Sequence, residues 1–222
     1  NLQTSVSPDE EKVLYFAREK KGHEGVKGTV TEDFRGILVH DHEITFYRYG
    51  SAHQECLAHV ERYLKDSMEN ESSLTWNRRM RELLQRMIHY RKEHTGEASL
   101  DAQTVAGFET EYQEILDKAK EEYKRNEPSP YYREGYNLYR RMQEYKTEHL
   151  LFLHDMRVPT TNNTAERCLR DYKRKQTFAM TFRSLESIEE LCHSKGVLLE
   201  VRKNNPNIYT AVMEIFNRRY GA

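Results

Sequence analysis

The order of apolar and polar residues divides the chain into three stretches: short mixed elements, a long helical block, and closing helices. The first stretch, residues 1–60, begins with a pattern that predicts a β-hairpin. One strand lies within Asn1–Ser7, the turn is at Ser7–Glu10, and Val13–Phe16 forms the return strand. A short helix is expected over His23–Val30.

Two further apolar runs in this first stretch have the length of buried strands. Gly36–Val39 is compact and apolar, and it ends in the polar residues His40–Glu43. Glu55–His59 is a second candidate strand that runs into a helix at Val60.

Residues 61–157 have the apolar spacing of amphipathic helices. We expect three main helices packed through their apolar stripes, with breaks at Thr95-Gly96 and Asn126–Pro130. The stripes contain Met80, Leu83, Leu84, Met87 and Ile88, then Val105, Phe108, Tyr112, Ile115, Leu116 and Ala119, then Leu138, Met142, Tyr145 and Leu153.

Residues 158–222 predict three more helices. The first starts near Asn163, the second near Ser184 or Ser187, and the last at Asn205-Pro206, with the asparagine as cap and the proline in the first turn. The chain is therefore divided at 1–60, 61–157 and 158–222, and its class is mixed α/β.

Composition agrees with long amphipathic helices, because 32 % of the 222 residues are charged and 37 % are hydrophobic, against about 25 % charged in an average domain. The 35 basic and 36 acidic residues nearly cancel. This balance argues against a uniformly basic nucleic-acid coat but leaves room for a local basic face. Three widely spaced cysteines indicate a reduced, cytoplasmic protein. No apolar run reaches the roughly 18–20 residues of a membrane span.

Asp41 is the first candidate for chemistry, since it stands where the predicted strand Gly36–Val39 ends. A carboxylate at the carboxyl end of a strand is a frequent functional position in α/β folds. Taken alone, a turn-forming aspartate explains it better. Adjacent strand residues point to opposite faces, so His40 and His42 do not easily join Asp41 on one ion.

The segment Thr160–Arg170 carries the densest signal in the chain. Asn163 as helix cap and Glu166 three residues later resemble a capping box, and Arg170 supplies an ion-pair partner one turn on. Between Thr161 and Gln176, five positive charges face two negative ones; the positive residues are Arg167, Arg170, Lys173, Arg174 and Lys175. Phosphate contacts and a merely solvated helix face explain this excess about equally.

Several familiar sites are excluded. Cys56 and His59 have part of a zinc-ligand spacing, but no second pair supplies the four ligands of a structural site. Glycine-rich phosphate loops, Gly-x-Ser-x-Gly elbows and His-Glu-x-x-His motifs do not occur.

Taken together, the motifs resemble the catalytic domain of the bacterial insertion-sequence-sixty-six transposases, a DDE transposase family. The resemblance extends over the whole chain. It rests on Gly36-x-x-x-x-Asp41, Cys56-x-x-His59-x-x-Arg62, Val158-Pro159-x-Thr161-Asn162-Asn163-x-Ala165-Glu166-Arg167-x-Leu169-Arg170, and Lys173-Arg174-Lys175-Gln176.

This resemblance implies an RNase H-like sheet with flanking helices and a large helical insertion. It implies that Asp41 is the second catalytic aspartate and Glu166 the catalytic glutamate, together holding two Mg²⁺ or Mn²⁺ ions. The first aspartate of the family lies in a His-x-Asp-Glu-Thr-like segment on the first strand. That segment is not found in these residues, so we expect this chain to lack the first strand and to be inactive by itself.

The resemblance also implies DNA as partner, both transposon ends and target, and a homo-oligomer in the active complex. Arg167, Arg170, Lys173, Arg174 and Lys175 are then assigned to DNA phosphates. Asn162 and Asn163 would position Glu166, while Cys56 and His59 would support the site. An RNase H-like nuclease or resolvase, and a non-enzymatic DNA-binding helical module, are the alternatives.

Overall fold

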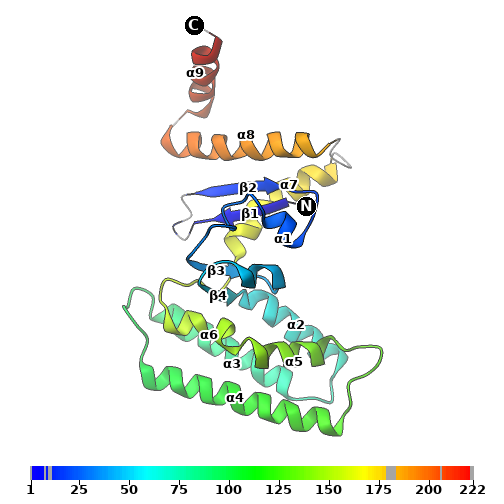
Figure 1. The fold of residues 1–222 in the computed structure, drawn as a ribbon. Helices are drawn as coiled ribbons and strands as arrows, with labels where there is room; N and C mark the ends of the chain where they lie inside the picture. Colours follow the sequence, from blue (N-terminus) through cyan, green and yellow to red (C-terminus); the bar gives the residue numbers. More distant parts are fainter. Residues whose placement is uncertain (1, 8, 10–11, 179–183, 206, 221–222) are drawn as a thin grey trace. The chain divides into compact units, whose positions relative to one another are not determined.

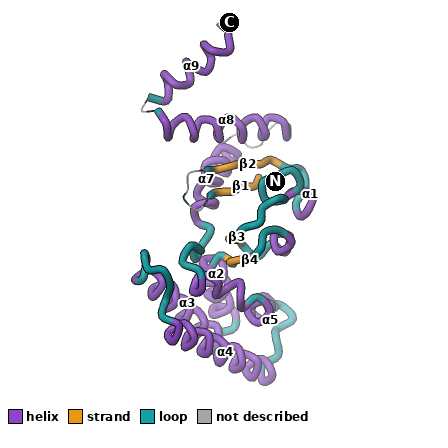
Figure 2. Tube along the Cα trace, turned by 60° about the vertical axis from the view of Figure 1, so that its left-hand side comes forward, coloured by secondary structure: helices purple, strands orange, loops and turns teal. Residues whose placement is uncertain are grey.

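Residues 2–7, 9, 12–178, 184–205 and 207–220 are described by the computed structural model, without the side chains of 171–173, 175–178 and 218–220. The chain divides into two units (Figure 1). Arg35–Asn162 form the central unit, and Asn1–Phe34 with Asn163–Ala222 form the terminal unit. Helices predominate over strands in the described residues, as Figure 2 shows, and the class is mixed α/β as expected.

The terminal unit begins with the predicted hairpin. Strands β1 (Leu2–Val6) and β2 (Val13–Ala17) pair antiparallel, with Leu2 opposite Ala17 and Val6 opposite Val13. Helix α1 (Gly22–Val26) is shorter than the expected helix over His23–Val30. It ends early because Gly28 has a left-handed backbone (φ 72°) and Thr29 turns back to donate its hydroxyl to the Val26 carbonyl at 2.7 Å.

Three helices complete this unit: α7 (Asn163–Phe178), α8 (Leu185–Asn204) and α9 (Ile208–Tyr220). Helix α8 packs on β2 and α7 packs on β1. Tyr15, Ala17 and Cys192 are the buried centre of this small core. The hydroxyl of Ser184 accepts from the Ser187 amide at 3.2 Å and caps α8, which confirms the helix start expected near Ser184 or Ser187.

The cap of the last helix differs from the expectation. The side chain of Asn205 donates to the Val201 carbonyl at 3.0 Å and so closes the end of α8. Asn207 caps α9 instead, because its Oδ1 accepts from the amides of Tyr209 at 3.0 Å and Thr210 at 3.3 Å. Pro206, expected in the first turn, lies outside the described residues.

The central unit begins with two parallel strands, β3 (Ile37–His40) and β4 (Ala52–Glu55), joined through the 3₁₀ helix η1 (Ile44–Arg48). Ile37 lies opposite Ala52 and His40 opposite Glu55. The strand expected at Gly36–Val39 is therefore present, displaced by one residue.

The strand expected over Glu55–His59 is wrong. β4 ends at Glu55, and helix α2 (Leu57–Asn70) begins two residues later. Leu57, Val60 and Leu64 repeat at helical spacing, and all three are fully buried. The apolar stripe of the helix thus begins inside the stretch that reads as a strand by length alone.

The helical block contains α3 (Trp76–Glu93), α4 (Ala102–Arg125), α5 (Glu134–Glu144) and α6 (Lys146–His154) in addition to α2. The last expected helix is divided in two, because Tyr145 leaves helical geometry (φ −110°, ψ 34°). The predicted apolar stripes form the core; its fully buried members include Met80, Leu83, Leu84, Met87, Tyr112, Ile115 and Met142.

Candidate active site

Asp41 follows β3 directly and is half-buried. Because β3 and β4 are parallel, their carboxyl ends lie at the same edge of the small sheet. The Asp41 carbonyl accepts from the Glu43 amide at 2.7 Å and starts the turn into η1. Its carboxylate forms no hydrogen bond or ion pair with the residues the structure describes.

The two histidines beside Asp41 have different partners. The His40 ring is buried, and its Nε2 lies 3.2 Å from Nδ1 of His53. Burial lowers the pKa of His40, and the hydrogen bond to the Asp41 carbonyl opposes this only in part. Nδ1 of His42 lies 2.6 Å from Oε1 of Glu55. Neither imidazole is thus bonded to the Asp41 carboxylate.

Glu55, the last residue of β4, carries a carboxylate that sequence reasoning missed. It is 1 % exposed. Its Oε1 accepts from His42 and from the hydroxyl of Tyr47. Its Oε2 lies 3.3 Å from Nε of Arg141 and 3.2 Å from Nε2 of His149. The only feature of the local sequence that could have indicated Glu55 is a charged residue between a strand and a helix. Its partners Arg141 and His149 lie far along the chain, so the local sequence does not contain them.

The electrostatics of this cluster keep Glu55 ionised. Burial by itself raises the pKa of Glu55, but the close approach of His149, the hydrogen bond from His42 and the charge of Arg141 outweigh it, so that the pKa is well below its ordinary value. Burial and the bond to Glu55 raise the pKa of the Tyr47 hydroxyl far above its ordinary value. Tyr47 therefore acts as a donor to this carboxylate.

Cys56 and His59 lie at the start of α2. Cys56 precedes the helix, and its buried sulfur accepts from the backbone amide of Asn162 at 3.4 Å. One residue on, the Leu57 amide donates to the Thr160 carbonyl at 2.9 Å. His59 is half-buried in the first turn. Cys56 and Leu57 thus hold the segment at residues 160–162 that leads to Asn163.

Helix α7 carries the predicted glutamate. It begins at Asn163 itself, so this residue lies inside the helix rather than before it. Helix boundaries vary by about one residue, and Asn163 is exposed. Glu166 is half-buried in the first turn, where the helix dipole favours a negative charge.

The basic residues follow Glu166 on the same helix. Arg167, Arg170 and Arg174 are exposed, and their spacing of three and four residues places them on one face. The side chains of Lys173 and Lys175 lie outside the described part of the chain. The described arginines form a positively charged stripe at helical spacing.

Asp41 belongs to the central unit and Glu166 to the terminal unit. Their convergence on one site stays a prediction. In residues 2–7, 9, 12–178, 184–205 and 207–220, no group of three histidine, cysteine or acidic side chains is arranged to hold a metal ion. No helix in these same ranges is long and apolar enough to cross a membrane.

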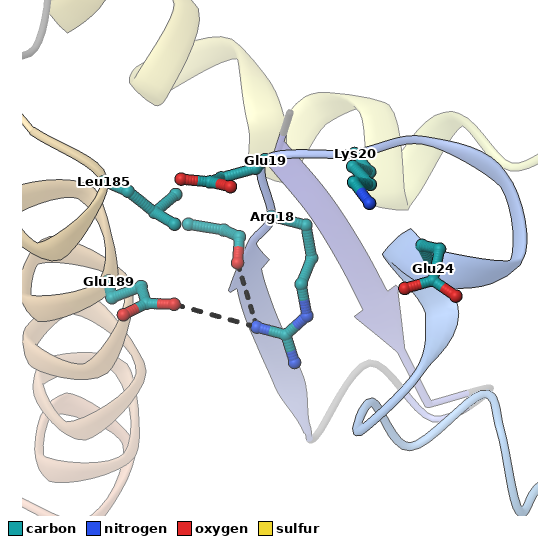
Figure 3. A pocket seen from close by; sticks show the side chains of 7 residues that line it. Arg18, Glu19, Lys20, Glu24, Leu185 and Glu189 are labelled. Atoms are coloured by element: carbon teal, nitrogen blue, oxygen red, sulfur yellow. Dashed lines mark hydrogen bonds and ion pairs between the residues drawn. The ribbon is translucent and has the colours of Figure 1, made fainter.

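A hollow of about 240 Å³ in the terminal unit contains none of the predicted site residues (Figure 3). Arg18 occupies its middle, where it donates to the Ala17 carbonyl at 2.9 Å and lies 3.9 Å from Glu189. The other residues that line it are Glu19, Lys20, Glu24 and Leu185. Charges of both signs alternate around this hollow, so it does not define a site for one class of ligand.

Comparison with known protein families identifies the class of protein to which the chain belongs. The family model described as Transposase IS66 family matches residues 2–190 of the chain. The chain belongs to this family, which confirms the resemblance inferred from its motifs. Searches of curated proteins and of solved structures found no match.

Proposed function

We propose that the chain is the catalytic domain of a DDE-type transposase with an RNase H-like core, in which Asp41 and Glu166 are catalytic carboxylates. The observation that supports this most is the carboxylate of Asp41. It is half-buried directly after a strand and unengaged by any described residue, in a chain that belongs to a transposase family.

Magnesium or manganese fits the donors that this proposal assigns. Both ions prefer carboxylate oxygens and keep waters and substrate oxygens as further ligands. When bound, such ions would supply Lewis-acid chemistry at a phosphodiester, for the attacking and the leaving oxygen. Asp41 and Glu166 would hold them, with Glu166 in the first turn of α7.

DNA is the partner in this proposal, as transposon ends and as target. The exposed arginines of α7 would bind phosphates beside Glu166, and Lys173 and Lys175 belong to the same run. Cys56 and His59 would support the glutamate by holding residues 160–162. Asn162 and Asn163 would set the start of its helix. We expect a homo-oligomer in the complex that joins DNA ends.

Binding of Mn²⁺, followed by its paramagnetic resonance signal, tests the assigned carboxylates without requiring turnover. Asp41→Asn and Glu166→Gln are each expected to weaken binding at least about tenfold, since each removes an anionic ligand of a hard cation. Glu114→Gln is the matched control, because Glu114 is an exposed acid on α4. Unchanged binding in Asp41→Asn would overturn the proposal.

In a chain that also contains the first aspartate, a strand-joining assay separates a transposase from a nuclease or resolvase, because only the transposase joins a cut 3′ end to target DNA. The 222-residue chain by itself is expected to join no DNA ends, because its sequence does not contain the segment in which the resemblance places the first aspartate. Joining by this chain would show that the remaining acids suffice.

A further inference from the structure

The buried carboxylate of Glu55 lies next to Asp41 in the fold. Glu55 is paired with His40 across the parallel strands, and Asp41 is the residue after His40. The Cys56 amide donates to the His40 carbonyl at 2.8 Å, one residue beyond the end of β4. The residue before Asp41 is therefore fixed to the end of β4 by its backbone.

His42, the residue after Asp41, is fixed to the end of β4 by the His42 side chain. Nδ1 of His42 lies 2.6 Å from Oε1 of Glu55, and Tyr47 of η1 donates to that same oxygen. Asp41 thus lies between two attachments to residues 55 and 56. This arrangement leaves little freedom to the direction in which the Asp41 backbone leaves β3.

The second oxygen of Glu55 faces the helical block. Arg141 comes from α5 and His149 from α6. The other nitrogen of His149 lies 2.9 Å from the hydroxyl of Tyr112 on α4. One carboxylate therefore connects the turn after Asp41 with three helices of the block.

We propose that Glu55 is a positioning residue, which holds the turn after Asp41 against helices α5 and α6 and so fixes the Asp41 carboxylate. The consequence for metal binding rests on the proposed function, whereas the positioning itself does not. Burying an ion pair contributes little net stability compared with apolar packing. A fully buried carboxylate with four polar neighbours therefore serves the geometry of the turn it anchors.

Amide hydrogen exchange in this chain, measured residue by residue, tests the positioning directly. Glu55→Gln keeps the shape of the side chain and removes its charge. The amides of Glu43, Thr45 and Phe46 are expected to exchange at least about tenfold faster, because hydrogen bonds to a charged group hold the turn closed. Amides inside α3 and α4 should keep their rates.

Glu71→Gln is the matched control. Glu71 is a half-buried carboxylate of the same unit, bonded to Ser67 at 2.8 Å and to Tyr123 at 3.1 Å. Faster exchange in this variant should stay near residues 67–77 and leave the turn after Asp41 unchanged. If both variants speed exchange throughout the unit alike, Glu55 is only a stabilising residue and the proposal falls.

A milder variant covers the case in which Glu55→Gln does not fold. Tyr47→Phe removes one donor to Oε1 and keeps the charge, and it should speed exchange of the same three amides by a smaller factor. Unchanged rates at Glu43, Thr45 and Phe46 in the folded variants would overturn the positioning role.

Mn²⁺ binding then separates the two proposals. Glu55→Gln should weaken it about threefold to tenfold, and Asp41→Asn more strongly. If Asp41→Asn has no effect on Mn²⁺ while the turn still opens in Glu55→Gln, the proposed metal site fails and the positioning role stands. If Asp41→Asn weakens binding but Glu55→Gln changes neither exchange nor binding, the reverse holds.

Discussion

The backbone amide of Asn162 donates to the thiol of Cys56 at 3.4 Å, although the two residues are 106 positions apart in sequence. The neighbouring bond from the Leu57 amide to the Thr160 carbonyl, at 2.9 Å, runs alongside it. Together they attach the segment that precedes helix α7 to the start of α2. Cys56 therefore has a structural role at the start of α2, as the acceptor for the amide of Asn162.

Replacing Cys56 by alanine should lower the free energy of unfolding by about 1–2 kcal/mol, since it removes a buried sulfur and leaves a small void. It should also speed exchange of the Asn162 amide, which loses its acceptor. Cys192→Ala is the control, because Cys192 is equally buried but lies in the terminal unit. Protection of Asn162 that survives Cys56→Ala would show that the sulfur is not its acceptor.

We predict that removing the buried hydroxyl of Tyr112 lowers the stability of the chain through a lost hydrogen bond rather than through a cavity. Its hydroxyl is buried between the Met142 carbonyl at 3.1 Å and Nδ1 of His149 at 2.9 Å. Tyr112→Phe leaves His149 without this partner and should cost about 1–2 kcal/mol in urea unfolding. Tyr131→Phe should cost nothing measurable, because Tyr131 is 96 % exposed. Equal effects of the two substitutions would refute this assignment.

We predict that Asp155 makes the free energy of unfolding depend on pH in the acid range. Hydrogen bonds from the Arg157 side chain, then from its amide, lower the pKa of Asp155 to about 2 from an ordinary 3.8. Because the folded pKa is the lower one, the contribution is fully present above the unfolded value and is lost as pH falls toward the folded one. Between pH 3.8 and about 2, Asp155→Asn should therefore lose less stability than the parent chain. Parallel curves of unfolding free energy against pH would contradict it.

We predict that replacing Arg170 changes the salt dependence of DNA binding. If its guanidinium contacts a phosphate, Arg170→Ala should reduce the slope of log affinity against log salt by about one unit. Fluorescence anisotropy of a labelled duplex at several salt concentrations measures this slope. Arg125→Ala is the control, since Arg125 is an exposed arginine at the end of α4. A slope equal to that of the parent chain would show that Arg170 is a solvent-exposed residue that does not contact a phosphate.

Local periodicity accounts for the elements that were predicted correctly. The hairpin β1–β2, strand β3, and the apolar stripes of α3 and α4 repeat with periods that a short window detects. The error at β4 and α2 arose at Leu57, where a short apolar run fits either structure. The last expected helix is divided at Tyr145, where the sequence has no proline or glycine. The break therefore could not be predicted from residue type.

The candidate site divides in the same manner. Asp41 and Glu166 are visible in the sequence because they stand at element ends and belong to motifs. Glu55 is not, because its meaning comes from Arg141 and His149, which only the packing of α5 and α6 brings to it. A lone charged residue between a strand and a helix reads as solvent-facing until those helices are in place.

The division of the chain into two units also sets an order of folding. The central unit is one continuous run of residues, whereas the terminal unit needs both ends of the chain. The bonds from the Cys56 amide to the His40 carbonyl and from the Leu57 amide to the Thr160 carbonyl join the end of β3, the start of α2 and the segment before α7. Once that unit has formed, the residues between the hairpin and helices α7 and α8 span a shorter effective loop than the same residues unfolded, and the entropic cost of closing it falls. A slow step in refolding is therefore expected to follow formation of the helical block rather than precede it.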